Sequence, residues 1–385
     1  MRFADNRNKI GKYIPAVVFL IFIYGMALWF IFSPKPDYSS SEKRYLQKFP
    51  EVTAEKLLSG DFGSEFETFF ADRFPQRNTW VGLNAYTALT EGNNGASGVY
   101  NCKNGYLINK PVSTENNLDK NIGAVADFAK SIDTPTTVML VPSTGYIVDD
   151  VLPTFHDKYN DDEDISKISS TLSKDKIGFV DLRERFKSEY KNGSQIYYKT
   201  DHHWTTKGAY TGYQELCKAL GITPIDDSTL KKDSYPDFYG TTYSSSGFWL
   251  TPPDNIEIWN NPKNSDRNIS VKITEGANIK TSGSMYFTDH LKEDDKYPVF
   301  IDGNHALTEI TNTNAKNGTI LLIKDSFSHS LAPFLAENYS KVVLVDLRYY
   351  KESVSDLVTT YNPEQVVVLY GIDNLATDTD IVWLK

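Results

Sequence analysis

The sequence is poor in cysteine and in positive charge. Only two cysteines, Cys102 and Cys217, occur among 385 residues, which excludes a disulfide-rich scaffold and paired Cys-x-x-Cys motifs. Nothing in the sequence fixes the distance between them, so one bridge and two free thiols both remain open. The formal net charge is −10, and no long basic run is present. Nucleic acid is therefore not expected as a partner, because binding phosphates requires clustered lysine and arginine.

Internal repeats and low-complexity tracts are also missing. A hydrophobic fraction of 40% and a charged fraction of 23% are typical of a globular protein and exclude a disordered one. At 385 residues the chain is long enough for one large or two ordinary domains. Aromatic residues are plentiful, including 24 tyrosines, which suits a surface that faces carbohydrate. Half-buried strand positions are, however, the more common use of tyrosine.

One long hydrophobic run is present near the N-terminus. Residues 13–32 carry no charge over 20 positions, about the length that spans a bilayer as a helix. The flanking segment 1–12 is basic, so the positive-inside rule predicts that it is cytoplasmic and that the rest of the chain is extracytoplasmic. A cleaved signal peptide is the less favoured alternative, because the run is long and no small-x-small site follows it. We expect an uncleaved, single-pass anchor in the cytoplasmic membrane.

Residues 33–77 are expected to form a tether and an amphipathic segment. The polar, proline-containing stretch 34–41 suits a short linker. Between 54 and 70, apolar residues recur at intervals of three and four and predict an amphipathic helix that packs on the domain behind it (Leu57, Leu58, Phe62, Phe66 and Phe69).

Residues 78–385 are expected to form an extracytoplasmic α/β domain. Buried-type strands alternate with helix-length segments, which predicts βαβ units and a parallel sheet flanked by helices. The expected strands are 105–108, 136–142, 178–182, 320–323, 342–347 and 366–370, and the expected helices are 118–131, 165–173, 206–220 and 328–338. The stretch 221–300 is polar with short alternating runs, and it predicts a β-rich insert.

Ser326 is the first residue whose position suggests chemistry. It follows the apolar strand 320–323, and open α/β sheets place their ligand sites at the carboxyl ends of such strands. The helix expected after it offers backbone N–H groups and a positive dipole end to a developing oxyanion. A helix-capping serine would occupy the same position, so this stretch alone supports a nucleophile and a cap equally.

The motif Asp201-His202-His203-Trp204 supplies the missing partners. Asp201 and His203, two residues apart, point to the same side of an extended segment, so the carboxylate can orient the imidazole. With Ser326 they make up a Ser-His-Asp acyl-transfer site. Two alternatives are weaker. A metal site from Asp201, His202 and His203 is disfavoured because adjacent imidazoles face opposite ways and no third ligand is evident. The motif could also be purely structural and cap the helix that begins at Thr206.

This tetrad resembles the signature of the bacterial DHHW proteins, which are relatives of the SGNH-hydrolase-like, alginate O-acetyltransferase-type periplasmic proteins. The resemblance extends over most of the chain beyond residue 33 and includes the segments 42–50, 60–77, 104–107, 140–142, 300–305, 324–327 and 346–349. It implies a circularly permuted SGNH-hydrolase-like fold, with Asp201 as the acid, His203 as the base and Ser326 as the nucleophile. The sequence departs from ordinary SGNH enzymes at Lys324, where they have glycine, and in an acid–base spacing that is one residue shorter.

The resemblance also implies an asparagine in the oxyanion hole. Asn374, after the last strand, is one candidate and Asn304 is its rival. Arg348 and Tyr349, at the end of the neighbouring strand, are candidates for substrate binding. Arg348 could equally pair with Asp346 or Asp373.

The expected function is that of a membrane-anchored O-acyltransferase, most simply an O-acetyltransferase, or an esterase. It would act on cell-surface polysaccharide or exopolysaccharide, with no cofactor and no metal. The resemblance implies a membrane-bound O-acyltransferase as partner, and the insert 221–300 is the candidate for contact with glycan. The alternative is a non-catalytic glycan-binding or assembly component of a polysaccharide export or modification complex, since a fold does not fix a function.

Overall fold

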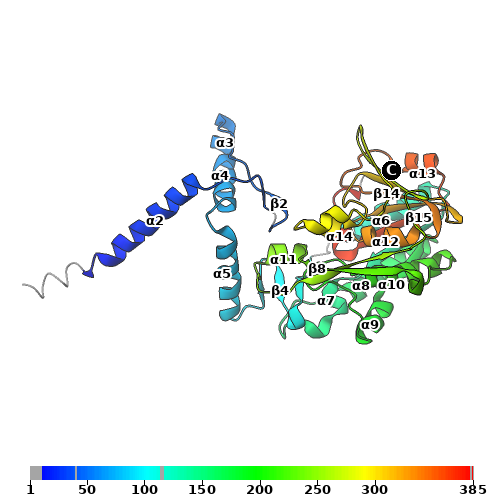
Figure 1. Cartoon of the computed structure of the whole chain (residues 1–385), viewed down its shortest axis with the longest axis horizontal. Helices are drawn as coiled ribbons and strands as arrows, with labels where there is room; N and C mark the ends of the chain where they lie inside the picture. Colours follow the sequence, from blue (N-terminus) through cyan, green and yellow to red (C-terminus); the bar gives the residue numbers. More distant parts are fainter. Residues whose placement is uncertain (1–10, 40, 113–116, 382–383, 385) are drawn as a thin grey trace, which may run out of the picture. The chain divides into compact units, whose positions relative to one another are not determined.

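The computed structural model describes residues 11–39, 41–112, 117–381 and 384. The chain divides into two compact units, residues 1–87 and 88–385 (Figure 1). Most of the segment expected to be cytoplasmic, 1–12, lies outside the described residues.

The first unit begins with an apolar helix, α2 (Ile14–Phe32). The helical stretch Gly11–Phe32 has a mean hydropathy of 2.4, and by length and composition it can cross a membrane. Two short paired strands and three helices follow: β1 (Tyr38–Ser39), β2 (Arg44–Tyr45), α3 (Ala54–Ser59), α4 (Asp61–Asp72) and α5 (Arg77–Thr90).

The single helix expected over 54–70 is interrupted. Gly60 has a φ of +87°, which ends α3 and begins α4. Glycine adopts this left-handed conformation at little cost, whereas other residues rarely do. The apolar periodicity continues across the break, so it did not reveal the break.

The second unit is built around an eight-stranded mixed sheet, ordered β11-β10-β12-β14-β13-β15-β6-β7. Its strands are β6 (Thr136–Val141), β7 (Gly178–Asp181), β10 (Ile269–Glu275), β11 (Asn278–Ser282), β12 (Leu307–Asn312), β13 (Asn317–Lys324), β14 (Tyr339–Val345) and β15 (Gln365–Gly371). The five strands from β14 to β7 are parallel, as the sequence predicts, whereas β12, β10 and β11 are antiparallel. The expected α/β class with a large sheet flanked by helices is confirmed.

Side chains alternate across this sheet and separate two hydrophobic cores. On β13, Ile320 and Leu322 belong to one core, while Leu321 and Ile323 belong to the other. The first core is covered by α7 (Thr144–Ile147), α9 (Arg183–Lys191), α10 (Thr206–Leu220) and α12 (Ser328–Leu335). The second is covered by α6 (Asn117–Ser131), α8 (Asp161–Lys174), α13 (Val354–Tyr361) and α14 (Ile372–Thr377). Burial on both faces explains why these strands are continuous apolar runs.

The strands of the stretch 221–300 belong to two different sheets. Its first half forms a separate pair of strands, β8 (Lys231–Phe238) and β9 (Asp254–Asn260), with α11 (Thr241–Ser246) between them. Its second half, β10 and β11, extends the central sheet through β12. Three short strands precede the central sheet: β3 (Gly95–Ala96), β4 (Val99–Asn101) and β5 (Leu107–Asn109).

The two cysteines are free and buried. Burial raises the pKa of both Cys102 and Cys217 to about 12, so both thiols stay protonated at neutral pH. Both therefore act as small apolar side chains of the first core.

Candidate active site

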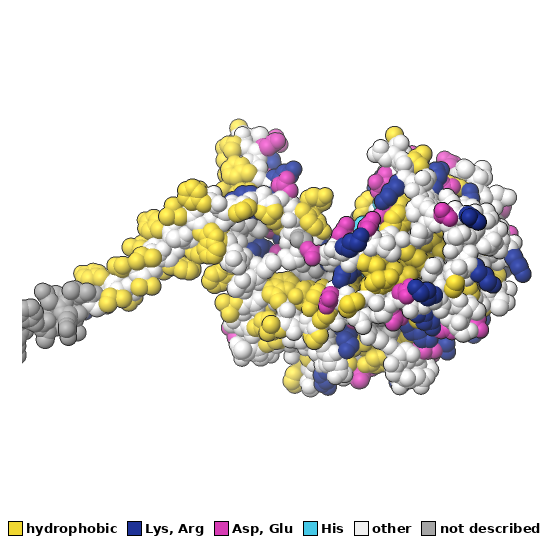
Figure 2. Space-filling view, viewed as in Figure 1, with side chains coloured by type: hydrophobic (Ala, Val, Ile, Leu, Met, Phe, Trp, Pro, Cys, Tyr) yellow, Lys and Arg dark blue, Asp and Glu magenta, His cyan; other side chains and the backbone are white. Residues whose placement is uncertain are grey.

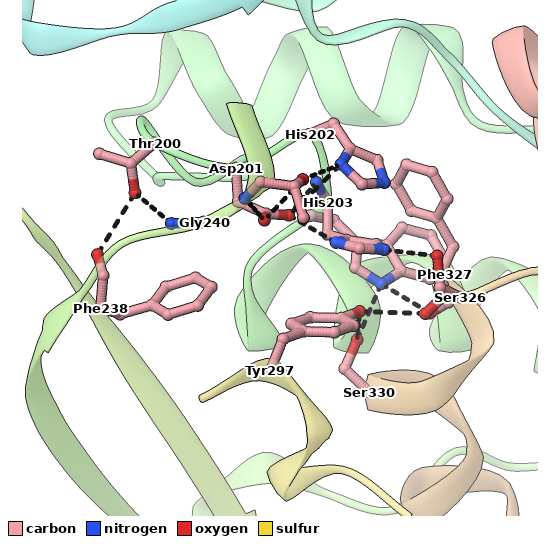
Figure 3. A network of polar contacts seen from close by, with 12 residues as sticks. Thr200, Asp201, His202, His203, Phe238, Gly240, Tyr297, Ser326, Phe327 and Ser330 are labelled. Carbon is pink, nitrogen blue, oxygen red and sulfur yellow. Dashed lines mark hydrogen bonds and ion pairs between the residues drawn. The ribbon is translucent and has the colours of Figure 1, made fainter. Parts of the chain in front are cut away.

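A chain of hydrogen bonds joins Asp201, His203 and Ser326 (Figure 3). Ser326 lies 123 positions after His203 in the sequence, but the fold brings the two side chains together. His203 Nδ1 lies 2.5 Å from Asp201 Oδ1, and His203 Nε2 lies 2.7 Å from Ser326 Oγ. A carboxylate can only accept, so Nδ1 carries the proton and Nε2 is left to accept from the serine hydroxyl. All three side chains are buried. This is the arrangement that a general base and its nucleophile require.

The loop that carries Asp201 and His203 is a tight hairpin. A bridge between Tyr197 and Trp204 closes it, and α10 follows directly. Thr205 caps this helix by accepting a hydrogen bond from Gly208 N. Capping therefore belongs to the residue after the motif.

Asp201 is fixed by a second loop, at the start of α11. Its Oδ2 accepts a hydrogen bond from Thr241 N at 2.7 Å, while its Oδ1 accepts from His203 N at 2.8 Å. A Cβ added to Gly240 would lie 2.1 Å from Asp201 Cβ, so only glycine leaves room for the carboxylate. Both carboxylate oxygens are thereby held in one orientation.

Behind this loop lies the buried carboxylate of Asp254, on β9. It accepts hydrogen bonds from the backbone N–H groups of Lys199 and Thr200, at 2.9 and 2.8 Å to Oδ2, and from the Thr200 hydroxyl at 2.7 Å. The residues just before Asp201 are thus tied to a strand more than fifty positions away. No sequence motif marks Asp254.

Two aromatic side chains support the imidazole and the serine. The ring of Tyr297 stacks on His203 with centroids 4.0 Å apart and an angle of 11°. Its hydroxyl donates to Ser326 O at 3.2 Å. The Trp204 indole N–H donates to Phe327 O and to Ser330 Oγ, at 3.0 and 2.9 Å. The fourth residue of the motif therefore holds the serine segment in place.

Asp325, just before the serine, organises the strand end. Its Oδ1 accepts from Phe327 N at 2.9 Å, and its Oδ2 accepts from Gly371 N and from Asn374 Nδ2, both at 2.7 Å. Burial raises the pKa of Asp325, and these hydrogen bonds oppose the shift. The carboxyl ends of β13 and β15 are joined through this one side chain.

Lys324, which replaces the glycine of ordinary SGNH enzymes, is fully buried at the end of β13. Its ammonium donates to Asp346 Oδ2 at 2.8 Å and lies 2.9 Å from His329 Nε2. Burial and the Lys324 charge hold the pKa of His329 well below its ordinary value, so His329 is neutral and accepts this hydrogen bond. The buried ammonium is thus satisfied by an anion and a neutral imidazole.

The other predicted site residues divide into two groups. Asn374 lies beside the trio, since Asp325 holds its amide and it lines the adjoining cavity. Asn304 and Arg348 are hydrogen-bonded to each other: Arg348, just after β14, donates to Asn304 Oδ1 at 2.8 Å and to Asp346 Oδ2 at 2.6 Å. This second group adjoins the first, because Arg348 and Asn374 line one pocket together with Asp325. Of the two partners considered for Arg348, the structure selects Asp346. Tyr349 is 50% exposed, beside the Arg348 guanidinium.

The adjoining cavity has a volume of about 60 Å³. Its lining includes Ser143, Tyr159, His202, Phe327, Asp373 and Asn374. A Cβ on Gly371 would lie 2.6 Å from the Phe327 ring, so glycine lets this ring form part of the wall. A space of this size holds a few waters or one small group next to the serine segment.

Two carboxyl groups lie at this cavity: Asp373 lines it, and Asp161 is linked to Asp373 through Ser143. Burial raises the pKa of Asp373 to about 7, with a further rise from the nearby charge of Asp161, and burial raises the pKa of Asp161 to about 6. Ser143 links them: its N–H donates to Asp161 at 2.7 Å and its hydroxyl to Asp373 at 3.2 Å. Sequence reasoning missed this pair as well as Tyr297, because each contact joins distant segments.

Asp201, His202 and His203 also place one ligand atom each within 4.8 Å of one another, as a metal site would. Their donor atoms already have partners within the protein, however. His203 uses both ring nitrogens for Asp201 and Ser326, and His202 Nδ1 lies 2.7 Å from Thr241 Oγ1. A cation would have to displace these hydrogen bonds, so the donor set fits a proton-transfer site better than a metal site.

The sheet order, the strand-end serine and the hydrogen-bonded histidine define an SGNH-hydrolase-like α/β protein. The DHHW protein family matches residues 112–345, more than half of the chain, and the chain belongs to this family.

Solved structures share the fold. A DHHW family protein from Eubacterium siraeum is 18% identical, with a TM-score of 0.62 over 75% of this chain and 95% of that chain. PatB1 from Bacillus cereus, solved with a sulfonyl adduct, is 20% identical, with a TM-score of 0.59 over 72% of this chain and 95% of that one. The O-acetyltransferase domain of Pseudomonas putida AlgJ is 14% identical, with a TM-score of 0.48 over 74% and 98%. At these identities the similarity to the first two structures defines a fold only. No curated protein sequence matches the chain.

Proposed function

We propose that this protein is a membrane-anchored, extracytoplasmic serine O-acyltransferase or esterase that moves an acetyl group on cell-surface polysaccharide or exopolysaccharide. The observation that carries the proposal is the buried hydrogen-bond chain from Asp201 through His203 to Ser326. A serine that is merely structural would not need an imidazole base whose tautomer is fixed by a carboxylate.

In the proposed reaction, His203 Nε2 takes the proton of Ser326 Oγ as the oxygen attacks the acyl carbonyl. The resulting imidazolium, stabilised by Asp201, gives this proton to the leaving oxygen when the carbonyl–leaving-group bond breaks. An acyl-serine remains. A sugar hydroxyl, in the transferase, or water, in the esterase, then attacks the acyl carbonyl while His203 Nε2 takes its proton. The bond between the acyl carbon and Ser326 Oγ breaks, and the imidazolium returns the proton to Oγ.

The tetrahedral intermediate requires hydrogen-bond donors at its oxyanion. We assign one of them to Asn374. Its amide nitrogen is anchored by Asp325, and the same side chain lines the cavity beside Phe327. Backbone N–H groups at the start of α12 are the second source, since a helix N-terminus favours negative charge.

The anchor and the partners complete the proposal. Helix α2 crosses the cytoplasmic membrane once with residues 1–12 inside, residues 33–77 form a tether and an amphipathic segment, and residues 78–385 form the extracytoplasmic catalytic domain. A membrane-bound O-acyltransferase is the proposed source of the acyl group, and a polysaccharide its acceptor.

The test is covalent labelling of the full-length protein in detergent. PatB1 has been solved with a sulfonyl adduct, which supports the use of phenylmethylsulfonyl fluoride beside a fluorophosphonate probe. Intact mass should show one adduct on the wild type and none on Ser326→Ala or His203→Asn. Ser328→Ala is the matched control, because Ser328 is also a buried serine, two residues away, and should keep the adduct.

An adduct that persists in Ser326→Ala contradicts the assignment of the nucleophile. A wild type that neither reagent modifies between pH 6 and 9 supports the non-catalytic glycan-binding component instead.

A further inference from the structure

Helix α4 carries aromatic residues on one face only. Phe62, Phe66, Phe69 and Phe70 follow the spacing of a helical stripe, whereas Ser64 lies on the opposite side. Ring contacts connect them to two further phenylalanines, and we call the whole set the aromatic surface: Phe49, Phe62, Phe66, Phe69, Phe70 and Phe74.

Much of this surface is open to solvent. Phe49 is 58% exposed, and Phe66 and Phe70 are each 40% exposed. On the preceding helix, α3, Leu58 is 90% exposed. Figure 2 shows hydrophobic side chains along α2 and on one side of α3 and α4, with charged side chains on their other side. Continuous apolar surface of this kind marks a binding site for protein or membrane.

The aromatic surface is attached to the end of the apolar helix α2. The ring of Phe30, in the last turn of α2, lies 4.7 Å from that of Phe70 and 6.2 Å from that of Phe69. A helix that spans a bilayer ends at the boundary between hydrocarbon and headgroups. If α2 spans, then α4, packed on its last turn, lies at that same depth.

The same, C-terminal end of α4 has a second attachment, through its last residue, Asp72. Asp72 accepts hydrogen bonds from Arg44 at 2.9 Å and from Gln47 N at 2.9 Å. The C-terminal end of α4 is therefore held both by the ring contacts with Phe30 and by the hydrogen bonds of Asp72.

The charge of these helices indicates which lipids they would meet. The first turns of α3 and α4 carry Glu55 and Asp61, and Lys56 is paired with Glu65 at 2.8 Å. Neutral headgroups fit this surface, because anionic lipids are recruited by clustered lysine and arginine. Phenylalanine and leucine are the residues by which interfacial helices enter the headgroup–acyl boundary.

We propose that α4 is an interfacial helix whose aromatic surface lies in the outer leaflet, among neutral lipids, beside the point where α2 leaves the membrane. This inference rests on the proposed single-pass anchor. It adds a second attachment to the bilayer, so the chain leaves the membrane lying along its surface. Salt leaves this attachment unchanged, since apolar burial rather than charge drives it.

The experiment measures depth in the full-length protein reconstituted in phosphatidylcholine nanodiscs. A nitroxide is attached to a single introduced cysteine, and its collisions with oxygen and with nickel-EDDA are compared. The native Cys102 and Cys217 are buried, and the wild type serves as the labelling blank. The variants are Phe66→Cys and Leu58→Cys on the apolar side, Ser64→Cys as the matched control on the opposite face of α4, and Ile21→Cys as the reference for the span.

We expect the ratio of oxygen to nickel-EDDA collisions at positions 58 and 66 to exceed that at position 64 at least threefold, at both 50 mM and 500 mM salt. Equal ratios at positions 64 and 66 overturn the proposal.

Two other results at position 66 also overturn it. A label that is shielded from both reagents indicates a protein partner, and a label that shows dipolar broadening indicates a second copy of the chain. Position 58 is so exposed that its substitution cannot disturb packing. A deep label at Ile21 with a shallow one at Phe66 rejects the interfacial helix alone, whereas a shallow Ile21 rejects the anchor.

Discussion

His203 is held on three sides by groups with different tasks. Asp201 fixes its tautomer, Ser326 occupies its free nitrogen, and Tyr297 covers its face. An aromatic face attracts a cation, so the stack would favour the imidazolium that the proposed reaction forms. Tyr297 is a positioning residue by this reasoning, since it reaches the reacting atoms only through its neighbours.

Replacing Tyr297 separates its ring from its hydroxyl. Tyr297→Leu removes the stack, and we expect the rate of fluorophosphonate labelling to fall about 3- to 10-fold, because such aromatic pairs contribute roughly 0.5–1.5 kcal/mol. Tyr297→Phe keeps the ring and should retain most of the rate. Intact mass spectrometry of samples quenched at successive times measures the labelling rate of both variants, and the melting temperature checks that they are folded. Equal losses in the two variants would indicate that the hydroxyl, not the ring, matters.

The carboxyl pair at the cavity predicts a dependence of stability on pH. Burial raises the pKa of Asp373 to about 7, whereas the unfolded carboxyl ionises near its ordinary value of 3.8. The folded protein therefore binds more protons than the unfolded chain between these values, and its stability falls as pH rises from about 4 to about 7.

Asp373→Asn removes this penalty. We expect the variant to gain about 1–4 kcal/mol over the wild type between pH 5 and pH 8, since one pKa unit corresponds to about 1.4 kcal/mol. Urea unfolding at both pH values measures the difference. Glu163→Gln, on the exposed start of α8, is the control and should follow the wild type at every pH. A variant whose advantage does not grow with pH would contradict the buried, partly protonated carboxyl.

At the level of elements, the site is a meeting of loops from separate parts of the chain. The motif loop is held by Asp254 from β9, by Thr241 from α11 and by the serine segment from β13. The local hydrophobic pattern predicted the helices and strands well, because the type of each element depends mainly on its own residues. The helix expected at 206–220 coincides with α10, and the strand expected at 320–323 lies within β13.

Long-range pairing could not be predicted in this way. Nothing near Tyr297 or Asp254 indicates that the first stacks on an imidazole and that the second accepts three hydrogen bonds from residues 199 and 200. The stretch 221–300 alternates like a set of strands, but only tertiary contact decides that β10 joins the central sheet and β8 does not. The proximity of Asp201, His203 and Ser326 could be predicted, because acyl-transfer chemistry requires an acid, a base and a nucleophile at strand and loop ends. Their catalytic role stays a prediction.

Asp254 offers a test of how far the site depends on its supporting loop. Asp254→Ala leaves the buried N–H groups of Lys199 and Thr200 without their acceptor, and we expect a loss of about 2–4 kcal/mol in unfolding free energy. Labelling of Ser326 should slow as well, although Asp254 does not contact it. Asn255→Ala, at the exposed neighbouring position, should change neither quantity. Normal labelling in a destabilised Asp254→Ala would show that the hairpin keeps its shape without this support.

At the level of the whole molecule, the proposed chemistry requires that the anchor and the catalytic unit lie on defined sides of a membrane. The basic residues before the apolar helix outnumber the acidic one (Arg2, Arg7, Lys9 and Lys12 against Asp5), which predicts that the N-terminus is cytoplasmic.

A cysteine introduced at position 11 (Gly11→Cys) should then react with a membrane-impermeant maleimide only after lysis. A cysteine at Asn192, in the exposed turn after α9, should react in intact spheroplasts. The reverse pattern would place the serine on the cytoplasmic side, away from any polysaccharide acceptor. If the Gly11→Cys label is missing from the mature chain after lysis, the helix is a cleaved signal sequence, and both the anchor and the interfacial role of α4 fall with it.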